Sequence, residues 1–160
     1  MFIYSLNVLK RIIKGVKKNL KQKKSAQEMF YELSYYTLTH PDPLFIHQNA
    51  VDAFTAQNAD ENTKTIAVAF ALIGLYLLLE KGFSGKEIQN AHVKLGKHRK
   101  KWPKFNLPEN RGEINISKVL DTPKGFKRDE MIKEWCISVW RAYDASQEKV
   151  ASLVQTELWK

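Results

Sequence analysis

Hydrophobic residues recur at spacings of three and four along most of the chain, which is the period of one face of an α-helix. In residues 1–24 this apolar stripe consists of Leu9, Ile12, Ile13, Val16 and Leu20. Lysines lie opposite the stripe. The pattern predicts a basic amphipathic helix over residues 1–24, followed by a helical bundle domain over residues 25–160.

Local signals mark where the following helices begin. Ser25 and Glu28 have the spacing of a capping box, in which each side chain bonds the backbone N–H of the other residue. Ser84 and Glu87 repeat this spacing. Asp42, followed by proline, has the composition of a helix N-cap. The helices expected from these signals run over residues 25–38, 42–58 and 62–81, from Ser84 to the basic run before Trp102, and over residues 126–158.

The helix over residues 62–81 contains the longest uncharged stretch of the chain, "TIAVAFALIGLYLLL". Because so many consecutive uncharged residues can be hidden only on all sides, we expect residues 66–79 to form the buried centre of the bundle. A membrane span needs about 18–20 such residues, so the stretch is too short to cross a bilayer. Gly82 follows it and favours the left-handed conformation that ends a helix.

Residues 102–124 contain three prolines and a glycine, which predicts an ordered connector laid over the bundle. One helical turn is expected after Ser117, and "EINI" is a weak strand candidate. A long last helix then runs from Phe126 to Leu158. The expected fold is all-α: a single-domain bundle of five or six helices around a buried central helix, with the Pro-containing connector before the long last helix.

The net charge of +9 is concentrated in two places. Residues 1–27 carry eight basic residues and residues 94–104 carry six, and neither segment has an acidic residue. Candidate contacts to an anionic membrane surface or to nucleic acid are Lys10, Arg11, Lys14, Lys17, Lys18, Lys21, Lys97, Arg99, Lys100 and Lys101. The N-terminal helix could equally pack on its own bundle or on a second subunit of a homo-oligomer.

Cys136 is the only cysteine, so the chain has no intramolecular disulfide and no zinc-finger spacing. The charges near the N-terminus follow the apolar residues, whereas a secretory signal peptide places them first. These features predict a cytoplasmic protein, membrane-peripheral if its N-terminal helix binds lipid. Cys136 itself is expected to be a small core residue.

The segment "IHQNAVDAF" (46–54) places a histidine and an aspartate inside a helical pattern. At about 100° per residue, His47 lies on the apolar stripe with Phe54. Asp52 lies about 140° away, nearer the polar side with Gln48. The two side chains do not share a face, so they do not predict a catalytic acid–base pair. We expect His47 to contact the core through at least one hydrogen bond, and Asp52 to pair with a basic residue.

Four stretches together resemble an uncharacterised bacterial family of small helical proteins, DUF5946. They are "FIHQNAVDAFTAQN" (45–58), "GLYLLLEKG" (74–82), "WPKFNLPENRGEINISKV" (102–119) and "EWCISVWRAYD" (134–144). The resemblance covers residues 29–145 and implies a helical fold, while the family has no assigned activity. Its pattern of His, Val-Asp-Ala-aromatic and Gln corresponds to His47, Val51, Asp52, Ala53, Phe54 and Gln57.

This chain departs from the family pattern in two places. Members often carry a cysteine near the N-terminus and a histidine after the Gln. Here no cysteine precedes Cys136, and Asn58 takes the place of the histidine. A cysteine-dependent metal site is therefore not implied.

Three functions are compatible with these observations. The first is a non-enzymatic binding or regulatory module, with a ligand or partner site near His47, Asp52 and Gln57. The second is a helical-bundle enzyme whose metal is held by histidines and carboxylates from several helices. The third is peripheral membrane or nucleic-acid binding through the basic N-terminal helix. The first asks least of the sequence, which assigns no catalytic residue, no metal ligand and no cofactor.

Overall fold

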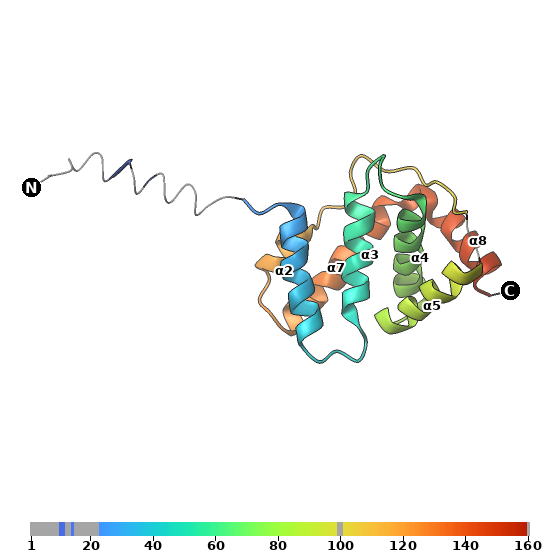
Figure 1. Cartoon of the computed structure of the whole chain (residues 1–160), viewed down its shortest axis with the longest axis horizontal. Helices are drawn as coiled ribbons and strands as arrows, with labels where there is room; N and C mark the ends of the chain where they lie inside the picture. Colours follow the sequence, from blue (N-terminus) through green and yellow to red (C-terminus); the bar gives the residue numbers. More distant parts are fainter. Residues whose placement is uncertain (1–9, 12–13, 15–22, 99–100, 160) are drawn as a thin grey trace, which may run out of the picture.

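The structure is a computed structural model that describes residues 10, 11, 14, 23–98 and 101–159, and every regular element in them is helical (Figure 1). The α-helices are α2 (Ala26–Thr39), α3 (Ile46–Asn58), α4 (Thr65–Lys81), α5 (Gly85–His98), α6 (Ile116–Asp121), α7 (Phe126–Ala142) and α8 (Gln147–Glu157), with a 3-10 turn, η1, at Asp144–Ser146. The all-α prediction is confirmed. The weak strand candidate "EINI" forms no strand in the described residues, because Ile116 already begins α6.

The central helix is α4, as predicted. Eight of its residues are buried, and α3, α5, α7 and α8 all pack against it. It begins at Thr65 rather than Asn62, because Asp60 and Thr63 close a turn through hydrogen bonds in both directions. None of the helices that the structure describes combines the length and apolarity needed to cross a bilayer.

The predicted capping signals form as hydrogen bonds. The Ser25 hydroxyl accepts from the N–H of Glu28 at 3.1 Å, and the Glu28 carboxylate accepts from the N–H of Ser25 at 2.8 Å. Ser84 and Glu87 make the same pair of bonds at 3.2 and 2.7 Å. Gly82 ends α4 with φ +70°. Local sequence therefore sets these helix ends.

The third helix begins later than predicted. Asp42 is not its N-cap residue; its carboxylate accepts from the backbone N–H groups of Leu44 in the loop and of Ile46, the first residue of α3. Phe45 has φ +55°, a left-handed conformation that interrupts a right-handed helix. Contacts with α5 hold the loop in this shape, because the Lys86 N–H donates to Leu44 O at 3.1 Å.

The long last helix predicted over residues 126–158 is in fact two helices, α7 and α8, separated by η1. Tyr143 lies at the break, where its buried hydroxyl donates to Ala56 O of α3 at 2.6 Å. The Asp144 carboxylate caps the turn by accepting from the next N–H. The bend directs α8 back onto α4, which raises the number of described α-helices to seven.

Of the helix predicted over residues 1–24, the structure describes Lys10, Arg11, Lys14, Lys23 and Lys24. The first three are helical and exposed, whereas Lys23 and Lys24 are exposed and lie outside any helix. The remainder of residues 1–22 lies outside the part of the chain that the structure describes.

Helices α3 and α4 approach each other closely because small residues line their contact. Three buried alanines of α3 face the bundle interior: Ala50, Ala53 and Ala56. On α4, a Cβ atom built at Gly74 would lie 1.9 Å from the Asp52 carboxylate oxygen Oδ2. No side chain at position 74 fits without displacing Asp52.

This contact predicts opposite effects for the same substitution in two helices. Gly74→Ala should lower the free energy of unfolding by about 1–3 kcal/mol, because the added methyl group overpacks the α3–α4 contact. Gly96→Ala is the matched control: its Cβ would meet only Phe70 Cζ, at 3.9 Å. There the higher helix propensity of alanine should raise stability by about 0.5–1 kcal/mol. Urea unfolding of both variants measures this, and equal effects would contradict the packing described.

Candidate functional site

His47 contacts the core, as its position on the apolar stripe predicts. Its ring is half-buried, and Nδ1 lies 2.8 Å from the Thr37 hydroxyl on α2. The rings of Phe30 and Phe45 flank it, with centroids 6.5 and 5.8 Å away. Burial lowers the pKa of His47, which favours the neutral imidazole. His47 therefore joins α3 to α2.

Asp52 faces the interior, so the prediction that it lies near the polar side is wrong. Its side chain is 3% exposed and sits against Gly74 of α4. The Gln48 amide, one turn earlier, donates to Oδ1 at 3.0 Å, while Oδ2 has no hydrogen-bond partner within the described residues. The expected pairing of Asp52 with a basic residue is not found among the described residues. Burial raises the pKa of Asp52 well above the usual carboxyl range, which favours the protonated, neutral carboxyl group.

Gln57 holds the connector to the bundle. Its amide nitrogen donates to Ile114 O at 2.7 Å and to Arg111 O at 3.2 Å. Its amide oxygen accepts from the Trp135 indole N–H of α7 at 2.8 Å. Both ends of the amide are thus occupied by the protein.

The three candidate residues do not converge on one cavity. His47 faces α2, Asp52 faces α4, and Gln57 faces the connector and α7. Each of these side chains packs α3 against a different neighbour, so in this structure the three contribute to helix packing.

The candidate anion contacts are only partly described. Lys10, Arg11, Lys14, Lys97 and Lys101 are exposed. Lys17, Lys18, Lys21, Arg99 and Lys100 lie outside the described residues. Contact of these residues with an anionic surface stays a prediction.

The described residues contain no group of three or more His, Cys, Asp or Glu side chains that could hold a metal ion. Cys136 is buried, as expected for a core residue, and its thiol lies 3.5 Å from Asn49 O. Burial raises the pKa of the Cys136 thiol, which disfavours the nucleophilic thiolate.

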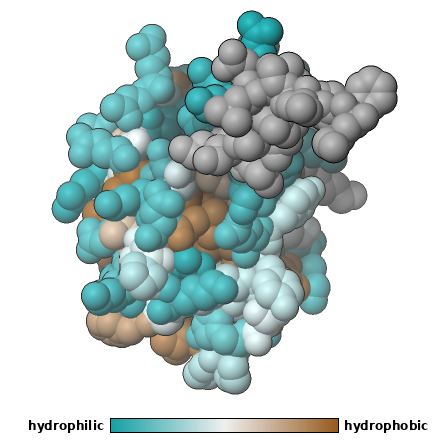
Figure 2. Space-filling view, turned by 90° about the vertical axis from the view of Figure 1, so that its left-hand side faces the viewer, coloured by the Kyte–Doolittle hydropathy of each residue, from teal (hydrophilic) through white to brown (hydrophobic). Residues whose placement is uncertain are grey.

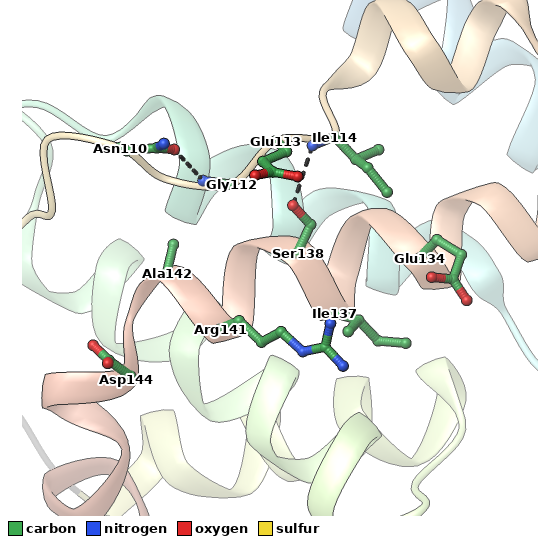
Figure 3. A pocket seen from close by; sticks show the side chains of 10 residues that line it. All are labelled: Asn110, Gly112, Glu113, Ile114, Glu134, Ile137, Ser138, Arg141, Ala142 and Asp144. Carbon is green, nitrogen blue, oxygen red and sulfur yellow. Dashed lines mark hydrogen bonds between the residues drawn. The ribbon is translucent and has the colours of Figure 1, made fainter.

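One surface cavity, of about 570 Å³, lies between α7 and the connector (Figure 3). Arg141 extends along α7 towards Ile137. Glu134 and Asp144 lie at opposite ends of the group of lining side chains labelled in Figure 3. The Ser138 hydroxyl accepts from the Ile114 N–H at 3.1 Å. This hydroxyl holds the connector in place.

A second cavity, of about 630 Å³, is lined by residues of the α2–α3 loop, the α4–α5 turn and the first turns of α7, among others. The two connecting segments lie at the lower end of the bundle in Figure 1. We name this cavity the basal pocket. Its lining consists of His40, Pro41, Asp42, Leu44, Ile46, Asn49, Leu78, Gly82, Phe83, Ser84, Gly85, Glu87, Asp129, Glu130 and Lys133. An apolar wall and four carboxylates thus face one space.

Three of these carboxylates are held by protein donors. Asp42 accepts from two backbone N–H groups, one in the α2–α3 loop and one at the first residue of α3. Asp129 accepts from the Tyr36 hydroxyl at 2.7 Å, and Glu87 accepts from the Ser84 N–H at 2.7 Å. The bonds from Ser84 lower the pKa of Glu87, so this carboxylate keeps its negative charge. The donors fix the positions of these three carboxylates.

The fourth carboxylate, Glu130, is exposed and makes no hydrogen bond or ion pair within the described residues. Lys133 is the one ammonium group in the lining, and it forms no ion pair with the carboxylates there. Asn49 reaches the pocket from α3, with its amide oxygen buried and without a hydrogen-bond partner in the described part of the chain.

Sequence patterns did not reveal the basal pocket, because its residues come from four helices and two connecting segments, and two of its four carboxylates look like ordinary helix caps. The only local signal was the capping chemistry of Asp42 and Glu87. Asp42 and Glu87 come to line the same space only after α3, α4 and α5 have packed.

The fold and cavities define a small all-helical protein with an acidic pocket at one end of its bundle. The chain belongs to a family of unknown function, DUF5946, whose family model matches residues 16–144. The resemblance predicted from the motifs is thereby confirmed. Neither the curated proteins nor the solved structures contain a match to this chain.

The neutral state of Asp52 predicts how stability depends on pH. An unfolded aspartate releases its proton near pH 4, whereas folded Asp52 keeps it to higher pH. The unfolded state then binds fewer protons, so the contribution of Asp52 to stability is full below about pH 4 and is lost as pH rises through the folded-state pKa. Asp52→Asn cannot ionise and lacks this loss.

Urea unfolding of the parent and of Asp52→Asn between pH 4 and 8 tests this account. The stability of the variant relative to the parent should increase with pH. The comparison cancels the opposite effect of His92, whose pKa burial lowers to about 4 and which both proteins share. A difference that stays constant with pH would show that Asp52 is not held protonated.

Proposed function

We propose that this protein is a non-enzymatic binding module and that its basal pocket takes a small organic cation with an apolar body. The observation that carries the proposal is the lining itself: four carboxylates and one ammonium group around an apolar wall. The chain as a whole has a net charge of +9, so this acidic lining runs against the overall charge. A cation would find complementary charge here and repulsion at the two basic segments, residues 1–27 and 94–104.

The apolar wall supports a ligand with a hydrocarbon part. Leu44 is 64% exposed in the loop before α3, and Ile46, Leu78 and Phe83 continue the wall with partly buried side chains. Covering such surface stabilises a complex by about 25 cal/mol for each Å² removed from water. A cavity of about 630 Å³ lies within the usual range of small-molecule sites.

The carboxylates can face a ligand without rearrangement, because Asp42, Glu87 and Asp129 are already fixed by protein donors. Glu130 remains exposed for a direct ion pair with the ligand. The amide of Asn49 adds a neutral polar contact. Preformed groups of this kind reduce the entropy that binding costs.

No reaction is part of this function, and we infer a cytoplasmic location for the protein. The buried thiol of Cys136 has a raised pKa, and the Ser138 hydroxyl is bonded to the connector backbone. Neither is prepared as a nucleophile. A single free cysteine suits a reducing compartment.

Three probes with the same carbon skeleton test the charge preference: 2-phenylethylammonium, 2-phenylethanol and phenylacetate. Chemical-shift mapping by NMR should show the ammonium compound binding most tightly and phenylacetate most weakly. The shifts should centre on Leu44, Phe83 and Glu130. Equal affinity for the three compounds, or tightest binding of phenylacetate, would refute the proposal.

Glu130→Gln and Glu134→Gln form a matched pair on α7, because only Glu130 lines the basal pocket. Glu130→Gln should weaken binding of 2-phenylethylammonium about two- to fivefold, since an exposed ion pair contributes about 0.5–1 kcal/mol. Glu134→Gln should leave the dissociation constant unchanged. A larger loss with Glu134→Gln would place the cation in the other cavity.

A further inference from the structure

His40 lines the basal pocket from the end of α2, where it is the C-cap residue of the helix. Its ring nitrogen Nδ1 lies 2.7 Å from the backbone oxygen of Tyr36, one turn earlier. A carbonyl oxygen only accepts hydrogen bonds, so Nδ1 must carry the proton of this bond. In a neutral imidazole the other nitrogen, Nε2, is then a hydrogen-bond acceptor.

This acceptor is available to a ligand. Nε2 of His40 makes no hydrogen bond within the described residues, and it does not belong to the buried polar atoms that lack one, so it is open to solvent. The ring also packs against the ring of Tyr36, with centroids 4.8 Å apart and planes inclined by 40°. The hydrogen bond and the ring contact together fix the orientation of the imidazole.

A second acceptor comes from α7. The Tyr36 hydroxyl donates to Asp129 at 2.7 Å, so the last turn of α2 lies against the first turn of α7. Glu130 follows Asp129, and its exposed carboxylate lines the same pocket without a partner in the described residues. The pocket therefore offers a neutral and a charged acceptor from neighbouring helices.

We propose that His40 selects the ligand of the basal pocket: the site takes a primary ammonium group, which donates to Nε2, in preference to a quaternary ammonium group, which has no N–H. The inference rests on the function proposed for this pocket and adds the hydrogen-bonding class of its ligand. A primary ammonium group carries three donors, so it can bond Nε2 and still pair with the Glu130 carboxylate. Against a quaternary ammonium group, Nε2 would lose its water without gaining a partner.

The apolar body of such a ligand has a surface to lie on. The end of the bundle that carries the two connecting segments is at the bottom of Figure 1 and, because Figure 2 is turned about the vertical axis, also at the bottom of Figure 2. Hydrophobic residues, in brown, reach the surface there beside hydrophilic ones, in teal. An alkyl or aryl amine matches this mixture better than an inorganic cation, which would leave the apolar wall in water.

Two cations with the same carbon skeleton separate the hydrogen bond from the charge: 2-phenylethylammonium and its N,N,N-trimethyl analogue. NMR titrations of the full chain at pH 8 should give a dissociation constant about three- to tenfold lower for the primary ammonium compound. In His40→Phe, which keeps a ring against Tyr36, this preference should fall below about twofold, because the primary ammonium loses its acceptor. His98→Phe is the matched control and should keep the preference, since His98 is exposed on α5 and does not line the pocket.

A measurement on the parent chain needs no variant. Two-bond ¹H–¹⁵N spectra should show that His40 carries its proton on Nδ1. The Nε2 signal should shift further with 2-phenylethylammonium than with the trimethyl compound.

Equal affinities of the parent for the two cations, an unchanged preference in His40→Phe, or a ring proton on Nε2 of His40 in the free protein would overturn the role of His40. Each of these results would leave the cation pocket itself standing. If neither cation binds more tightly than 2-phenylethanol, the proposed function fails and this inference fails with it.

Discussion

The contact between Asp52 of α3 and Gly74 of α4 is the constraint on which the arrangement of the bundle depends. Helix α4 is buried, so its neighbours must cover it from every side. Helix α3 does so with alanines, and at Gly74 it inserts a carboxyl group where no Cβ fits. A charged carboxylate in that position would be costly to desolvate, and burial accordingly raises the pKa of Asp52.

Once α3 is fixed on α4, other hydrogen-bonding groups of α3, from side chains and backbone, determine where the remaining elements lie. Gln57 bonds both the connector and Trp135 of α7. Ala56 O accepts from the Tyr143 hydroxyl at the break between α7 and α8. The residues that first suggested a site therefore organise the fold. The exposed chemistry lies at the other end of α3, where Asn49 borders the basal pocket.

Sequence reasoning succeeded where a structure is determined locally. The capping boxes at Ser25 and Ser84 involve residues three apart, and the uncharged stretch of α4 requires burial whatever surrounds it. It failed where a distant contact decides. The inward direction of Asp52 depends on a glycine 22 positions later, and the left-handed Phe45 depends on the bond from Lys86 to the same loop. The division of the last helix likewise depends on Tyr143 reaching α3.

The protonation of Asp52 in the folded protein tests the central claim most directly. The carboxyl carbon of Asp52 can be followed by ¹³C NMR during a pH titration of the folded chain. The account predicts that this signal stays at its protonated position well above pH 4, while the exposed carboxylates titrate. An Asp52 signal that titrates together with the exposed aspartates would contradict it, because the α3–α4 contact would then contain a solvated charge.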